Sequence, residues 1–162
     1  MNYCFVTWVT HNSRVSERMV SYNPPDFIEG LRPVVFNYKD QIRVAELIVQ
    51  GAIKYHLSII TFNVLPDHVH ALVSIDSDDE LASKIGNIKG YVAHMIRKEQ
   101  GLSRRIWARK FNRKWIKDDM HYVNVIDYIN QNHIKHEQSW GEKMLCGYGE
   151  ELGELLQKLP GA

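Results

Sequence analysis

The pattern of hydrophobic and polar positions predicts four β-strands, because short runs rich in aromatic and β-branched residues are typical of strands. Segment 68–75 shows the clearest alternation, with Val69, Ala71, Val73 and Ile75 on one face. A turn at 65–67 precedes it and predicts a hairpin with the strand before. The predicted strands are 3–10, 57–64, 68–75 and 113–117.

Helical spacing of apolar residues predicts three long helices between and after these strands, at 40–55, 76–99 and 119–134. Asp40 is the expected N-cap of the first helix. Segment 11–39 contains three prolines and predicts a long irregular connection. A tail follows residue 138, with a short helix expected at 152–159.

The resulting order, β-α-β-β-α-β-α, predicts an α+β fold of the ferredoxin-like (RRM-like) kind. In this arrangement helices cover one face of an antiparallel sheet and the other face stays available. The last helix is an addition to the basic unit. A length of 162 residues suits one domain, so 1–162 is expected to form a single unit.

Composition fits an ordinary globular protein, with 44% hydrophobic and 24% charged residues. There is no apolar run of about 20 residues and no secretory leader, so a cytoplasmic location is expected. The two cysteines, Cys4 and Cys146, form no disulfide framework or zinc-ribbon pattern.

Positive charge is concentrated in one segment although the net charge is only +1. Between residues 97 and 117, basic residues alternate with aromatic ones and only Glu99 opposes them. Cations attract phosphates and unpaired bases stack on aromatic rings, so the segment favours nucleic-acid binding. The alternative is a solvated basic loop with its tryptophans in the core. The candidate DNA-binding residues are Lys84, Lys89, Arg104, Arg105, Arg109, Arg113, Lys114 and Trp107.

Two histidines lie on the polar face of the third predicted strand. Alternation places His68 and His70 together, opposite the apolar residues and next to the turn. Two imidazoles on one face of a strand can share a metal ion. A bare His-x-His is more often two unrelated histidines, and only the apolar alternation favours a site.

The last long helix presents Tyr128 and Asn132 four residues apart, so they are neighbours on its surface. Tyr122, Val125 and Ile129 fall on the side expected to pack on the domain. A phenol and an amide can therefore face the same target. The alternative is that Tyr128 is a packing residue whose hydroxyl is solvated.

Together these segments resemble the single-tyrosine HUH transposases, including the REP-associated tyrosine transposases. The resemblance covers roughly residues 3–135. It rests on FVTWVT in the first strand, LPDHVHALVSI around the histidines, IKGYVAHMIRK in the second helix and DYINQNHIKH in the last.

The resemblance implies a DNA-nicking and DNA-joining enzyme with Tyr128 as nucleophile. It also implies that His68, His70 and Asn132 hold Mg²⁺ or Mn²⁺, and that Lys89 lies in a DNA-contacting helix. The implied substrate is single-stranded DNA, often with hairpins, joined to the protein as a 5′-phosphotyrosine. Either a homodimer or a monomer is compatible with this family.

Two other functions are compatible with parts of the sequence. A non-catalytic RRM-like nucleic-acid-binding module shares the element order, but the aromatic signature of its central strands is absent. A two-histidine phosphoesterase, which needs two separate His-x-Ser/Thr motifs, is the second alternative; the candidate pair of the third strand is a single His-x-His.

Overall fold

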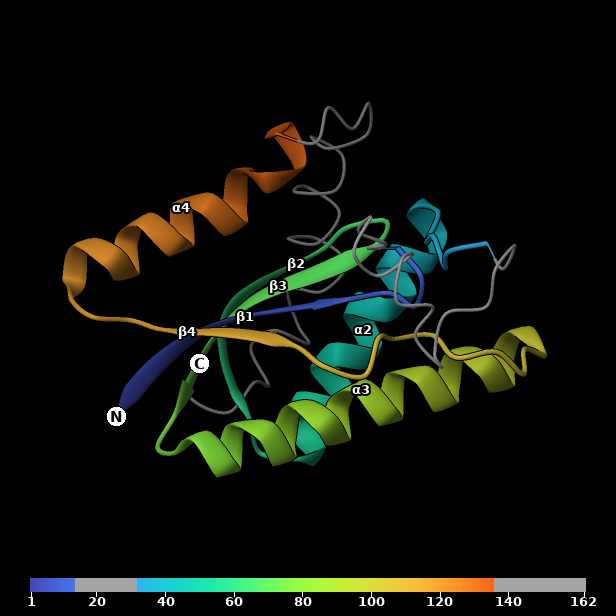
Figure 1. Ribbon diagram of the computed structural model, residues 1–162, viewed down its shortest axis with the longest axis horizontal. Coiled ribbons are helices and arrows are strands. Elements are labelled where there is room, and N and C mark those ends of the chain that lie inside the picture. Colours follow the sequence, from blue (N-terminus) through green and yellow to red (C-terminus); the bar gives the residue numbers. More distant parts are fainter. Residues whose placement is uncertain (14–31, 136–162) are drawn as a thin grey trace, which may run out of the picture.

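The computed structural model describes residues 1–13 and 32–135 and contains a four-stranded antiparallel sheet with helices on both sides (Figure 1). Most of the expected irregular connection, the tail and the helix expected at 152–159 lie outside the described residues. The elements in chain order are β1 (Asn2–Val9), α2 (Tyr38–Lys54), β2 (Ser58–Val64), β3 (His68–Ile75), α3 (Asp78–Gln100), β4 (Asn112–Trp115) and α4 (Asp119–Lys135).

The strand order β2-β3-β1-β4 confirms the ferredoxin-like prediction. The two central strands pair antiparallel, and Thr7 of β1 lies opposite His70 of β3. On the other side of β3, Asn63 of β2 also lies opposite His70. These three residues therefore form a row across the sheet.

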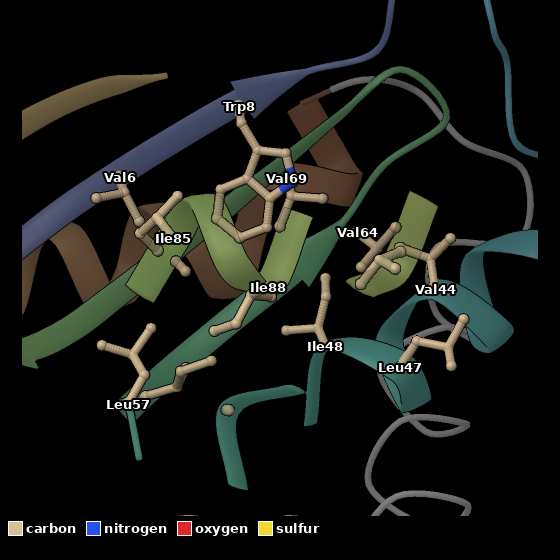
Figure 2. Packing of buried hydrophobic residues seen from close by; sticks show 14 of the residues in the cluster. Val6, Trp8, Val44, Leu47, Ile48, Leu57, Val64, Val69, Ile85 and Ile88 are labelled. Atoms are coloured by element: carbon tan, nitrogen blue, oxygen red, sulfur yellow. The ribbon is translucent and has the colours of Figure 1, made fainter. Parts of the chain in front are cut away.

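The main core lies between the sheet and helices α2 and α3, on the lower side of the sheet in Figure 1. The alternating residues of β3 point into it, as their pattern predicted. Figure 2 shows Val6, Trp8 and Val69 of the sheet packed near Ile48 of α2 and Ile88 of α3. Burying these side chains is the main source of stability, at about 1.5–3 kcal/mol each.

Helix α4 packs on the opposite face of the same sheet (Figure 1). Asp118 caps it, since its carboxylate accepts a hydrogen bond from the backbone N–H of His121 at 2.8 Å. Under the helix lies a second, smaller apolar cluster with Leu72, Val125 and Ile129 at its centre. The face that the ferredoxin-like unit leaves open is therefore partly covered by the helix that carries Tyr128.

One helix start differs from the expectation. Helix α2 begins at Tyr38, and its N-cap is Asn37, whose side-chain oxygen accepts the N–H of Asp40 at 2.8 Å. Asp40 is instead an acidic residue in the first turn, where a carboxylate is favoured by the helix dipole. Both residues are suited to this end of a helix, so the sequence alone did not separate them.

Candidate active site

The two histidines of β3 lie side by side on the face that α4 covers. Their ring centroids are 4.7 Å apart, and both side chains are buried. The turn before them is braced, because the backbone N–H of Thr10 donates to Asp67 and that of Phe36 donates to Pro66, at 2.8 and 2.7 Å. This bracing fixes the start of the strand that carries both rings.

Each histidine is oriented by a hydrogen bond at Nδ1. The Nδ1 of His68 lies 2.5 Å from the carboxylate of Asp67, which accepts, so the ring proton sits on Nδ1. The Nδ1 of His70 lies 2.7 Å from the hydroxyl of Thr7 on the neighbouring strand. Histidines that bind metal through Nε2 show this arrangement, with Nδ1 held by a carboxylate or another oxygen.

Helix α4 brings Tyr128 to the histidine pair. The ring centroid of Tyr128 is 5.3 Å from that of His70 and 5.9 Å from that of Phe5, which it meets edge-on. The side chain is 38% exposed, the most of any aromatic residue in this cluster. One face of the phenol is therefore fixed by packing while the residue stays accessible from solvent.

Asn132 lies one turn beyond Tyr128 on α4 and is only 1% exposed. Neither its amide oxygen nor its amide nitrogen has a hydrogen-bond partner within the part of the chain that the structure describes. A buried polar group without a partner costs about 1–3 kcal/mol, which favours a role in binding. The amide oxygen suits a cation.

The structure thus brings together His68, His70 and Tyr128, three of the four residues expected at the catalytic centre, and buries the fourth, Asn132, one turn further along α4. It also adds Thr7, Asp67 and Asn63, which the sequence did not single out. The sequence could have suggested Asp67, because a carboxylate directly before a candidate ligand can orient that ligand. Thr7 and Asn63 had none, because they adjoin His70 only through strand pairing.

The expected DNA-binding residues are not brought together. Lys114 is exposed and lies opposite Phe5 in the β1–β4 pairing, so its side chain is on the face that carries Tyr128. Arg113 is on the other face and pairs with Asp78 at 2.7 Å. Lys84 lies on α3, where it pairs with Glu80 at 2.6 Å.

The loop between α3 and β4 carries three more of the expected basic residues. Arg104 donates to the backbone carbonyl of Arg32 at 2.5 Å. Arg105 and Arg109 are exposed. Their cationic groups belong to a segment that packs beside α3, on the opposite side of the sheet from α4.

Trp107 forms no surface for base stacking, which corrects that expectation. Its indole is 4% exposed and meets the rings of Trp8 and Phe36 edge-on, at centroid distances of 6.2 and 5.5 Å. The loop that carries it has no helix or strand beyond an isolated bridge between Trp107 and Thr10, so no periodicity separated a core aromatic from an exposed one. Placing this tryptophan in the core was the alternative that the sequence left open.

Lys89 is likewise turned inward rather than toward DNA. It is 7% exposed, and its amine donates to the carbonyl oxygens of Ala108, Arg109 and Lys110 at 2.8, 3.2 and 3.2 Å. Burial lowers the pKa of Lys89 to about 8, so the amine is still mostly protonated at neutral pH. Lys89 therefore anchors the loop onto α3.

Replacing Lys89 with methionine should lower the free energy of unfolding by about 1–3 kcal/mol, because three backbone carbonyls lose their charged donor. Urea denaturation measures this, and Lys98→Met, at an exposed position of the same helix, is the control, with a change within about 0.5 kcal/mol. Unchanged stability together with weaker DNA binding would instead make Lys89 a DNA contact.

Comparison with known proteins identifies the class to which this fold and site belong. Residues 27–132 match the family model described as "Transposase IS200 like", which covers more than half of the chain. The chain belongs to this family of transposases.

Within that class, two similar proteins are REP-associated tyrosine transposases. A protein of Haemophilus influenzae named as a putative member of that group is 33% identical over 92 residues, which are 51% of this chain and 52% of the relative. The chain thus spans about half the length of this curated relative. A solved REP-associated tyrosine transposase bound to a REP hairpin shares the fold, with a TM-score of 0.56, 23% identity, and coverage of 83% of this chain and 68% of that one.

Two further properties hold for the described residues. No helix among them is long and apolar enough to cross a membrane. No three His, Cys, Asp or Glu side chains among them gather as a metal site. The candidate ligands at the histidine pair are of a different composition, because they combine two imidazoles with the amide of Asn132.

Proposed function

We propose that this chain nicks and rejoins single-stranded DNA, with Tyr128 as the nucleophile and a divalent ion held by His68, His70 and Asn132. The main support is the position of α4. It sets the Tyr128 ring 5.3 Å from the His70 ring, and on its next turn it buries an amide that lacks a hydrogen-bond partner among the described residues.

The donor set fits a divalent metal ion. Both histidines have Nδ1 within hydrogen-bond distance of an oxygen, and when Nδ1 donates to that oxygen Nε2 can act as a metal ligand. Asn132 adds an amide oxygen, and oxygen donors suit Mg²⁺ or Mn²⁺. All three ligands are neutral, so a bound ion would keep its charge and could polarise the scissile phosphate.

The proposed reaction at Tyr128 exchanges one P–O bond of the DNA backbone for a P–O bond to the protein. The phenol oxygen attacks phosphorus, a new O–P bond forms, and the bond from phosphorus to the 3′-oxygen breaks. The leaving oxygen ends as a 3′-OH, and the phenol proton passes to solvent. The 5′-phosphotyrosine conserves the bond energy, so a 3′-OH of another strand can reverse the step without ATP.

The proposed substrate is single-stranded DNA that contains a hairpin. This follows from the relative solved with a REP hairpin and from Lys114, the basic residue on the face that carries Tyr128. Because α4 packs on the sheet of its own chain, we propose that the site is assembled within one chain. Both a monomer and a homodimer are compatible with this arrangement.

Lys114 is the basic residue we propose to contact a phosphate near Tyr128. Lys114→Gln should weaken binding to all single-stranded sequences and reduce the slope of log affinity against log salt by about 0.7. Fluorescence anisotropy at several salt concentrations measures both effects. The matched control is Arg113→Gln, on the other face of the same strand, which should leave the slope unchanged. Equal effects of both variants would contradict this placement.

Incubating the protein with labelled single-stranded DNA and Mn²⁺ tests the function as a whole. We expect a covalent protein–DNA adduct that survives denaturation. Cleavage without an adduct would indicate a hydrolase. Binding without either would indicate the non-catalytic RRM-like module.

A further inference from the structure

Asn63 of β2 connects the histidine strand to the tyrosine helix. It lies directly opposite His70 in the β2–β3 pairing and is 4% exposed. Its Nδ2 donates to the backbone carbonyl of Ile129 at 3.3 Å. Ile129 adjoins Tyr128 in the chain, so this single side chain links the two halves of the site.

The orientation of the Asn63 amide is determined by its partner. A backbone carbonyl can only accept, so the NH₂ group must face Ile129 and Oδ1 must point away from it. That Oδ1 is buried, and no hydrogen-bond partner for it lies among the described residues. The amide is thus not explained by packing alone.

The rest of the contact under α4 is mainly apolar. Leu72, Val125 and Ile129 form its buried centre, with half-buried side chains around them. Apolar contact depends on the area buried and has no direction, whereas a hydrogen bond is directional. A slide of α4 by one turn would move its residues by about 5.4 Å. Such a slide would take Tyr128 and Asn132 away from the histidines.

We propose that Asn63 is a positioning residue that fixes the docking of α4, and thereby places Tyr128 and Asn132 against His68 and His70. The consequence for DNA transfer rests on the proposed function, but the docking itself does not. Asn63 does not take part in the bond changes at phosphorus. It acts through the backbone of α4.

Hydrogen exchange on the full chain without metal tests the docking directly. In Asn63→Leu, amides of α4 should lose about tenfold in protection, the equivalent of one hydrogen bond, while those of α2 and α3 keep theirs. Asn130→Ala is the matched control, because it removes only an exposed contact between the same helix and Thr61, at 3.2 Å. It should change protection less than twofold.

A second variant separates the hydrogen bond from the shape of the side chain. In Asn63→Asp, an ionised carboxylate faces the Ile129 carbonyl and cannot donate. Protection of α4 at pH 8, corrected for intrinsic exchange, should therefore fall at least as far as in Asn63→Leu, although the side chain keeps the shape of asparagine.

Binding of Mn²⁺, followed by electron paramagnetic resonance, provides a readout apart from activity. The affinity should fall severalfold in Asn63→Leu, because Asn132 is carried by the same helix. Unchanged α4 protection and Mn²⁺ affinity in this variant would overturn the proposal, as would an equal loss of protection in α2 and α3. If α4 loosens as expected but the wild-type protein forms no DNA adduct, the proposed function fails while the docking role stands.

Discussion

Tyr128→Phe is expected to abolish the covalent protein–DNA adduct while DNA affinity stays within about twofold. The substitution removes only the hydroxyl that would attack phosphorus. The ring keeps its edge-on contacts with Phe5 and His70, so α4 should stay docked. The adduct is measured on a denaturing gel with labelled DNA, and affinity by anisotropy.

Tyr122→Phe is the matched control for this loss. Tyr122 lies on the same helix, but its ring packs against Tyr3 at a centroid distance of 4.8 Å. Burial raises the pKa of Tyr122, which makes its phenolate harder to form. The Tyr122 variant should form adduct at the wild-type rate. Adduct formation by the Tyr128 variant would remove Tyr128 from the role of nucleophile.

The second large effect is expected at the histidine pair. Loss of a residue that only supports a metal ligand typically costs about ten- to hundredfold in metal affinity or activity. His68→Ala would remove a proposed direct ligand, so it should reduce Mn²⁺-dependent cleavage by more than that. His70→Ala should behave alike. Mn²⁺ binding should weaken in parallel. Cleavage and Mn²⁺ binding are measured on the same preparation of each variant.

A histidine away from the site provides the control. His94 is exposed on α3, and that helix packs on the other face of the sheet. His94→Ala should leave cleavage and Mn²⁺ binding unchanged. Cleavage by His68→Ala at the wild-type rate in Mn²⁺ would exclude the histidine pair as the metal site.

The fold was predictable wherever a period in the sequence was strong. Strand 68–75 was predicted with the bounds observed, because one face is wholly apolar and a one-residue shift would have exposed it. The apolar stripe of α3 was also recognised. Lys89 lies four residues after Ile85 and three before Val92, so the helical spacing places it on the buried side of α3. Its positive charge led instead to the prediction of a DNA contact.

For the candidate site, the sequence predicted which residues are neighbours within one strand or helix. It did not predict which elements come into contact. His68 and His70 share a strand, and Tyr128 and Asn132 share a helix, so local periodicity pairs each set. Docking of the helix onto the strand depends on tertiary packing. The cross-strand neighbours of His70 depend on register, and a shift between Ile59 and Thr61 makes that register irregular. For these reasons Asn63 could not be found without the structure.

The most direct measurement is to identify the residue that carries DNA after reaction. Trypsin should release residues 118–135 as one peptide that contains Tyr122 and Tyr128, because no lysine or arginine lies between its ends. Fragmentation by mass spectrometry then distinguishes the two tyrosines. The account predicts a nucleotide adduct through its 5′-phosphate on Tyr128. An adduct on Tyr122 or on another residue, or cleaved DNA with no modified peptide, would contradict it.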